Sequence, residues 1–394
     1  MSKIDFVPEA EALREEMVAV RRDLHMHPET AFEEVRTAGI VAQTLSSLGL
    51  EVQTGVGKTG VVAMLDGSDD GPTVLVRADM DALPIEEANK VDYVSQTAGK
   101  MHACGHDAHT AIGLAVAKML TKHKDRIHGR VKFVFQPAEE IARGAQAMIE
   151  DGALANPRPD VSLGLHVWNT LPLGRLGVAD GPTMAGSSLW TATLTGKGAH
   201  GAAPHLGIDP VVCAAHIITA LQTIVSRNVD PMDTAVVSAT QVHAGDTHNV
   251  IPQTAVLTGT MRSFKTEVRD LVTQRMDEII RGVAASFGCE ADFQIEHRTG
   301  PVVNHADVGN RLRPLFSDIV GADNLDLTTR TMGGEDMSFF MTDVPGMYFF
   351  VGSANEARGL NYGHHHPQFD IDEDVLPLGA ALLATAVAEY VIPG

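Results

Sequence analysis

The sequence predicts an α/β protein in which a mostly parallel sheet domain is interrupted by a smaller α+β domain. Continuous apolar runs alternate with helical patterns over residues 1–186, which is typical of parallel strands covered on both faces. Over residues 187–297 the strands alternate apolar and polar residues instead, as in a sheet with one covered face. Residues 298–394 return to the first pattern, with a buried run and a final helix.

The first part begins with two helices. The first helix is predicted by apolar residues at helical spacing, and it ends at the interruption His27-Pro28. These apolar residues are Leu13, Met17, Val20 and Leu24. The second helix is expected over about residues 32–48, before Gly49. The further elements expected in this part are strands at residues 60–65, 73–77, 131–135 and 161–165, and helices at about residues 107–120 and 142–149.

The interrupting segment follows the order strand, helix, strand, strand, helix, strand. This order predicts a ferredoxin-like, four-stranded sheet with two helices on one face. Its expected elements include strands at residues 190–194, 235–238 and 255–259, and helices at about 210–225 and 267–287. A strand at residues 347–351 and a helix at about 375–391 follow. The expected domains are residues 1–186 together with 298–394, and the inserted residues 187–297.

Composition limits the classes of function. The chain has 394 residues, 44% of them hydrophobic, so two domains with sizeable cores are expected. Lys and Arg total 30 against 50 Asp and Glu, a formal net charge of -20, which argues against nucleic acid and anionic membrane surfaces as partners. The cysteines at positions 104, 213 and 289 are too few and too widely spaced for a disulfide framework.

The sequence carries no predicted membrane span or export signal. The longest apolar stretches, such as residues 211–225, fall short of the ~20 apolar residues that a membrane span needs. The N-terminal residues lack the apolar segment of a secretory signal. We therefore expect a cytoplasmic protein, in agreement with its few cysteines.

Side chains that suit metal binding cluster at strand ends or turns. The clusters are residues 77–81 after one strand, 101–109 before a helix, 136–140 after another strand, and 165–167 where a strand ends. Because the carboxyl ends of parallel strands form the binding crevice of an open sheet, these clusters can meet at one edge. The histidine run at residues 364–366 is a further candidate.

The residue types in these clusters indicate a divalent transition metal, because thiolate, imidazole and carboxylate groups together suit such an ion. The candidates are too many for one tetrahedral ion and fit two ions that share a bridge. They are Cys104, His106, Glu140, His166 and one histidine of residues 364–366. Each has an ordinary alternative, since a buried cysteine can be a small hydrophobe and a histidine run can be solvated. Their coincidence at successive strand ends favours the metal site.

The adjacent Glu139 and Glu140 suggest a division of labour. Two carboxylates side by side at a buried strand end repel each other unless a cation neutralises one of them. One would then bind metal while the other carries protons. The alternative is a solvated helix start, where acidic residues are also favoured.

Short motifs along nearly the whole chain resemble a known superfamily when they are taken together and in order. They are RADMDALPI, CGHDAH, QPAEE, LHVW, the glycine-rich stretch Gly196–Pro210, NVIP, GTMR and HHPQFD. This set is similar to the dinuclear metallo-aminoacylase and carboxypeptidase superfamily. It most resembles the amidohydrolase branch, which contains hippurate hydrolases, N-acyl-amino-acid and N-acetyldiaminopimelate deacetylases, and auxin-conjugate amidohydrolases.

The resemblance implies an enzyme that hydrolyses the amide bond of an N-acyl amino acid with two divalent metal ions, zinc or manganese, with cobalt and nickel as alternatives. It implies that Glu139 is the general base and that Asp81 orients a metal ligand. The metal ligands that it implies are Cys104, His106, Glu140, His166 and His365. Many members carry His-x-Asp where this chain has Asp79-Met80-Asp81, and Asp at the position of Cys104. This departure fits the cysteine-containing branch and leaves the role of Asp79 open.

The resemblance also assigns roles to the inserted domain, which would serve as a lid and dimerisation domain. His200 would face the reacting carbonyl, usually from the partner subunit, and Asn249 and Arg262 would bind the substrate carboxylate. An arginine fork suits a carboxylate, although a surface ion pair is the alternative for Arg262. A homodimer is expected, also because the one-faced sheet needs cover, and a tetramer is left open.

Other functions remain possible at this stage. A thiol hydrolase would use Cys104 as nucleophile and a histidine as base, and it would be inactivated by a thiol alkylator but not by chelation. A binding protein would hold metal or amino acid without turnover. A dipeptidase or carboxypeptidase would use the same metal machinery on a peptide. The acyl group and the side chain of the substrate are not determined by these residues.

Overall fold

The computed structural model describes residues 4–393. The chain forms two compact units, of which the smaller comprises Pro182–Pro301 and Thr331–Glu335 and the larger comprises the other described residues. The boundaries predicted at residues 187 and 297 therefore lie inside the smaller unit. The physical reason is that its first and last long strands in sequence, Gly186–Thr195 and Glu290–Thr299, begin before residue 187 and end after residue 297. In addition, the Ala185 N–H donates to the Gly333 carbonyl (2.9 Å), which adds residues 331–335.

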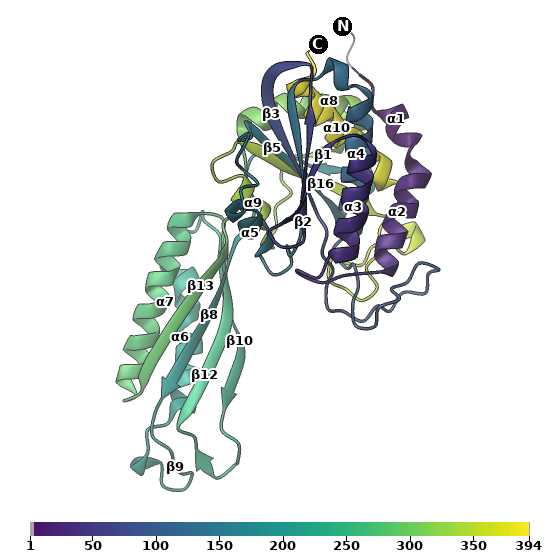
Figure 1. Cartoon of the computed structure of the whole chain (residues 1–394). Coiled ribbons are helices and arrows are strands. Elements are labelled where there is room, and N and C mark those ends of the chain that lie inside the picture. Colours follow the sequence, from purple (N-terminus) through teal and green to yellow (C-terminus); the bar gives the residue numbers. More distant parts are fainter. Residues whose placement is uncertain (1–3, 394) are drawn as a thin grey trace. The chain divides into compact units, whose positions relative to one another are not determined.

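The larger unit is built on an eight-stranded sheet with the order β1-β2-β4-β3-β5-β16-β6-β15 (Figure 1). The neighbours β4, β3, β5 and β16 run parallel, as do β6 and β15, whereas β1–β2, β2–β4 and β16–β6 are antiparallel. This mostly parallel sheet confirms the predicted fold class. The strands are β1 (Glu51–Val56), β2 (Gly60–Asp66), β3 (Asp69–Asp79), β4 (His128–Gln136), β5 (Val161–Pro172), β6 (Leu176–Gly177), β15 (Leu325–Asp326) and β16 (Gly346–Ala354).

The helices of the larger unit pack on this sheet and on one another. Helix α4 is buried on all sides over its first three turns, which explains the apolar run from Ala111 to Ala117 that follows the polar residues at its start. Helix α10 is almost as deeply buried. The helices are α1 (Val7–Glu11), α2 (Arg14–Met26), α3 (Val35–Ser47), α4 (His106–Lys122), α5 (Gly144–Glu150), α8 (Ala306–Val320), α9 (Met337–Phe340) and α10 (Val375–Val391). The short strands β7 (Gly181–Met184) and β14 (Val302–Asn304) stand at the sequence boundaries of the inserted segment.

The smaller unit contains a four-stranded antiparallel sheet with the order β10-β12-β8-β13 and two helices (Figure 1). Trp190, Ala192 and Leu194 are fully buried on the helix side, whereas Leu189, directly before them, is exposed, as the alternating pattern requires. The main elements are β8 (Gly186–Thr195), α6 (Pro210–Arg227), β10 (Ala235–Ala244), β12 (Thr254–Ser263), α7 (Thr266–Ser286) and β13 (Glu290–Thr299). A separate pair joins β9 (Ala199–His200) to β11 (Val250–Ile251).

Helix α6 is long and apolar enough to cross a membrane by length and composition alone, which the sequence reasoning did not expect. Its buried side chains include Cys213, Ile217 and Leu221, which belong to the core of the smaller unit. These core contacts account for part of the apolar composition, whereas Val211, Val212 and Val225 are exposed.

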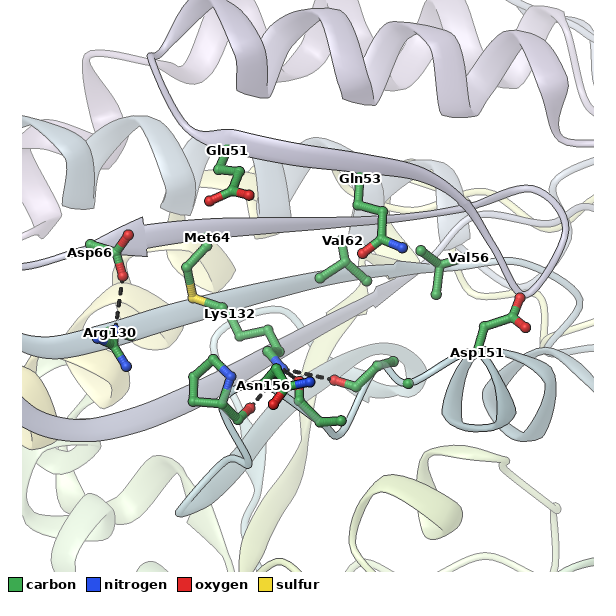
Figure 2. A pocket seen from close by; sticks show the side chains of 14 residues that line it. Glu51, Gln53, Val56, Val62, Met64, Asp66, Arg130, Lys132, Asp151 and Asn156 are labelled. Carbon is green, nitrogen blue, oxygen red and sulfur yellow. Dashed lines mark hydrogen bonds and ion pairs between the residues drawn. The ribbon is translucent and has the colours of Figure 1, made fainter.

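A pocket in the larger unit lies over β1, β2 and β4 and is closed on one side by residues 151–157 (Figure 2). Lys132 lies in it with only 2% of its surface exposed. Its Nζ donates to the carbonyl oxygens of Ala153 (3.1 Å), Ala155 (2.7 Å) and Pro157 (2.7 Å). The ammonium group therefore uses all of its protons to hold this loop against β4.

We predict that Lys132→Met destabilises the protein by about 1–3 kcal/mol, because buried acceptors lose a charged donor. The measurement is the midpoint of urea unfolding. Arg130→Met is the matched control, since Arg130 makes an exposed ion pair with Asp66 (2.9 Å) and such pairs contribute about 0–1 kcal/mol. Equal midpoints for Lys132→Met and the wild type would contradict this role of the lysine.

Candidate metal centre

The structure brings the five predicted metal ligands together at the carboxyl edge of the larger sheet. Glu139 and Glu140 follow β4, His166 lies in β5, and His106 is the first residue of α4. Cys104, His106 and His166 form one group whose ligand atoms all lie within 4.8 Å of one another. Cys104, Glu140 and His365 form a second such group. The two groups share Cys104, as expected of a site for two ions.

Unusual backbone conformations place these ligands. Gly105, between Cys104 and His106, has φ +91°, and an added Cβ would lie 2.4 Å from Val167 Cγ2. Only glycine fits there, so the turn presents the thiol and the imidazole to the same side. His365 also has a left-handed conformation (φ 66°), and its N–H donates to the Ala103 carbonyl (2.8 Å). Such strain is typical of functional sites that the surrounding structure holds in place.

Several of the candidate ligand atoms lie close together, at distances longer than those of ordinary hydrogen bonds. His365 Nε2 lies 3.3 Å from Glu140 Oε2, and Cys104 Sγ lies 3.6 Å from His166 Nε2. His106 Nε2 is 3.9 Å from Glu140 Oε1. Glu139 Oε2 lies 4.0 Å from His106 Nε2, and Glu139, Glu140 and His106 form a further group of candidate ligands.

Asp81, which follows β3 and which the resemblance assigns to orienting a metal ligand, contacts His106 and both glutamates. His106 Nδ1 lies 2.9 Å from the Asp81 carbonyl oxygen and 3.2 Å from its Oδ1. Nδ1 therefore donates to Asp81, and a neutral His106 ring, as in a metal-bound state, would carry its lone pair on Nε2. The same carboxylate accepts hydrogen bonds from the N–H groups of Glu139 (3.1 Å) and Glu140 (3.0 Å). One buried side chain thus positions an imidazole and both glutamates.

The donor set fits a divalent cation. Within residues 4–393, the buried atoms His106 Nε2 and Glu140 Oε1 have no hydrogen-bond partner. Buried polar atoms without partners are costly, and a cation between them would satisfy both. Sulfur, nitrogen and oxygen donors together suit zinc and similar ions.

The electrostatics of the site also favour positive charge. Burial lowers the pKa of His106, but the carboxylates of Asp79 and Asp81 outweigh this effect and raise it to about 10. Burial by itself would raise the pKa of Glu140. Its contacts with His365 and His106 have the larger effect, so the pKa of Glu140 lies below its ordinary value. His166 responds differently, because burial holds its pKa well below the ordinary value. It is therefore neutral, as a metal-binding imidazole must be.

Asp79, whose role the sequence left open, is occupied by protein partners. Its Oδ2 accepts from Arg77 Nη1 (2.6 Å) and its Oδ1 lies 2.6 Å from His109 Nδ1. His109 Nε2 in turn accepts from the Val167 N–H (2.9 Å), next to His166. Sequence reasoning did not single out His109, although its position one helical turn after His106 in CGHDAH was a usable signal.

The predicted site residues of the smaller unit lie at two separate places. His200 pairs with Val250 in the β9–β11 ladder, and the Gly201 N–H donates to the Asn249 carbonyl (2.8 Å), so His200 and Asn249 are neighbours. Arg262 lies near the other end of β12, eight residues beyond Thr254, which corresponds to about 26 Å along a strand. The structure therefore brings His200 and Asn249 together and leaves Arg262 apart from them.

The carboxyl edge of the parallel sheet carries a set of sulfur, nitrogen and oxygen ligands, and a second carboxylate lies beside them. This arrangement is typical of a metal-dependent hydrolase. The comparisons agree with this class. A sequence model of peptidase family M20/M25/M40 matches residues 75–389, and the chain belongs to this family. It is a hydrolase of amide or peptide bonds.

Relatives across this family differ in the substrates that their names state. IAA-amino acid hydrolase ILR1-like 4 of Arabidopsis thaliana is 39% identical over 95% of this chain and 86% of its own. Thermostable carboxypeptidase 2 of Saccharolobus solfataricus is 40% identical over 93% of this chain and 94% of its own. N-acetyl-L-cysteine deacetylase of Bacillus subtilis is 37% identical over 92% of this chain and 85% of its own.

A solved structure supports the metal site. The YXEP protein of Bacillus subtilis, whose title describes a dinuclear metal binding peptidase, matches with a TM-score of 0.83 and 34% identity. The match covers 95% of this chain and 97% of that one.

We predict that Cys104→Ser lowers the metal content of the purified protein, because a hydroxyl is a far poorer anionic ligand than a thiolate. Elemental analysis measures this content. Cys213→Ser, which changes a buried cysteine of the smaller unit, is the control and should keep full metal. Full metal and full activity in Cys104→Ser would make Cys104 a packing residue.

Proposed function

We propose that this protein hydrolyses the amide bond of N-acyl amino acids and releases a free amino acid and a carboxylic acid. The observation that carries this proposal is the pair of carboxylates after β4. Both lie close to His106, but Glu140 also groups with Cys104 and His365, whereas Glu139 also groups with Glu335 and Asp336. A second carboxylate beside the ligands is suited to move protons. Relatives named as an N-acetyl-L-cysteine deacetylase and an IAA-amino acid hydrolase support the substrate class.

The larger unit supplies the proton chemistry. Two divalent cations, zinc or manganese in our proposal, would be held by Cys104, His106, Glu140, His166 and His365 and would lower the pKa of a water and polarise the amide carbonyl. Glu139 accepts the proton of the attacking water and then delivers it to the nitrogen of the leaving amine. Asp81 keeps the Glu139 backbone in place during both transfers.

The smaller unit supplies the groups that recognise substrate. His200 Nδ1 accepts from the Ala202 N–H (3.0 Å), so a neutral ring carries its proton on Nε2 and can donate it to the developing oxyanion. Asn249 and Arg262 bind the free carboxylate of the substrate, and the guanidinium provides a rigid fork for it.

The separation within the smaller unit supports a dimeric site. Arg262 lies about 26 Å along β12 from Thr254, the end of the strand that follows Asn249 and β11 in the chain, so Asn249 and Arg262 of one chain do not meet at one small carboxylate. In our proposal His200 and Asn249 therefore come from the partner subunit, and Arg262 belongs to the same chain as Glu139. The protein would then be an obligate homodimer for catalysis.

Carboxypeptidase activity is the second candidate, and the match to thermostable carboxypeptidase 2 favours it. The same machinery would cleave the last peptide bond, because a C-terminal residue also presents a free carboxylate next to an amide. Comparison of N-acetyl and N-benzoyl amino acids with dipeptides and longer peptides separates the two functions.

We predict that Arg262→Ala removes most of the preference for substrates with a free carboxylate. A charge-assisted pair is worth about 1.5–3 kcal/mol, so kcat/KM should fall about 10- to 100-fold for an N-acyl amino acid and little for its amide. The measurement is the ratio of kcat/KM for the acid and the amide. Arg281→Ala, which breaks an exposed ion pair with Asp277, is the control. An unchanged ratio in Arg262→Ala would reduce Arg262 to a surface residue.

We predict that two inactive variants restore activity when their subunits exchange. Glu139→Gln loses the base but keeps metal, and His200→Ala loses the oxyanion donor. In a heterodimer one of the two sites carries both native groups, so about a quarter of all sites should recover after random exchange. Mixing followed by a hydrolysis assay measures this recovery.

Mixing Glu139→Gln with other variants tests which residues the partner subunit supplies. Asn249→Ala should complement Glu139→Gln in the same way as His200→Ala, because the two residues are neighbours. Arg262→Ala should not complement Glu139→Gln. Absence of recovery with His200→Ala after confirmed exchange would place His200 in the same chain as Glu139.

A further inference from the structure

A buried ion cluster outside the ligand set is centred on Arg21 of α2. Arg21 is completely buried and uses three nitrogen atoms to contact three acidic residues. Nε donates to Asp107 (2.9 Å), Nη2 to Asp370 (2.6 Å) and Nη1 to Glu373 (3.2 Å). Further side chains complete the cluster, since His25 contacts Asp107 (2.8 Å) and the Tyr93 hydroxyl donates to Asp370 (2.7 Å).

Two of these carboxylates belong to the segments that carry candidate metal ligands. Asp107 directly follows His106 at the start of α4, and Asp370 lies five residues after His365. The two segments are far apart in sequence. One guanidinium therefore links the His106 segment to the His365 segment from the side of α2, in addition to the hydrogen bond from the His365 N–H to the Ala103 carbonyl.

Backbone hydrogen bonds to His365 and Pro367 also hold the His365 segment, and Arg21 adds a side-chain contact at Asp370. Residues 365–368 are exposed and belong to no helix or strand, whereas Phe369 and Asp370 are buried. His365 itself adopts a left-handed conformation, which a non-glycine residue holds only when its surroundings impose it. Asp370 is where this exposed segment enters the interior, and Arg21 contacts it at that point.

The geometry requires an arginine rather than a positive charge alone. A guanidinium presents donors in a rigid planar fork that reaches Asp107 and Asp370 at the same time, whereas a lysine ammonium is a point charge on a flexible stem. A buried ion pair is weak evidence for net stability, so a role in positioning explains the cluster better than a role in folding energy.

We propose that Arg21 is a positioning residue of the metal centre, which holds His106 and His365 at the spacing that two ions require. This inference rests on the metal site of the proposed function. It does not depend on the substrate.

The test is a titration of the metal-free chain with Co²⁺, whose visible absorption reports its ligands. Arg21→Lys should bind Co²⁺ at least about tenfold more weakly, as is typical when a group that orients a metal ligand is lost, and should show an altered spectrum. Hydrogen exchange of the metal-free variant should rise in residues 362–370. Arg22→Met is the matched control, because Arg22 is the next residue, is 38% exposed and also pairs with Glu373 (2.6 Å). Its Co²⁺ affinity should stay within twofold of the wild type.

A second variant keeps the test decisive if Arg21→Lys folds poorly. Asp370→Asn preserves the shape of the side chain and the Arg21–Asp107 pair but weakens the link to the His365 segment. It should weaken binding of one of the two Co²⁺ equivalents. Wild-type affinity and exchange in both Arg21→Lys and Asp370→Asn would overturn the proposal. Failure of the wild type to hydrolyse N-acyl amino acids would instead refute the proposed function while leaving these binding results intact.

Discussion

The carboxylate of Asp81 connects the segments on which the candidate metal centre depends. It lies at the end of β3 and accepts hydrogen bonds from the ring of His106 and from the backbone of Glu139 and Glu140. A shift of this one group would displace a ligand imidazole, a ligand carboxylate and the neighbouring base together. The parallel order of β4, β3 and β5 brings these segments to one edge, so the strand order is a precondition for the chemistry. The concentration of buried carboxylates at that edge then calls for cations.

Division of labour between the two units follows from their different construction. The larger unit buries its chemistry at a sheet edge that packing holds rigid, which suits ions that need fixed ligands. The smaller unit carries His200 and Asn249 on a short exposed ladder and Arg262 on a long strand. Because the β9–β11 ladder is separate from the sheet that carries Arg262, the proposed function uses a second copy of the chain to gather these groups around one small substrate.

Much of the fold and the ligand set could be predicted because local patterns determine them. Continuous apolar runs mark the buried strands, and metal-type residues stand where those runs end. Strand β1 was missed, since most of its residues are exposed or half-buried and form no apolar run. The cluster around Arg21 was also missed, because its partners Asp107 and Asp370 lie 86 and 349 residues away in sequence. The motifs predicted one shared role for Asn249 and Arg262, but only the length of β12 reveals their separation.

The central claim is that two metal ions at the Cys104–His365 ligand set drive amide hydrolysis. The most direct measurement removes metal with a chelator and restores it stepwise with Zn²⁺ or Mn²⁺ while N-acetyl amino acid hydrolysis is followed. The account predicts no turnover in the metal-free chain and full recovery at two equivalents per chain. Turnover that survives complete metal removal but is lost on thiol alkylation would contradict it and would make Cys104 a nucleophile.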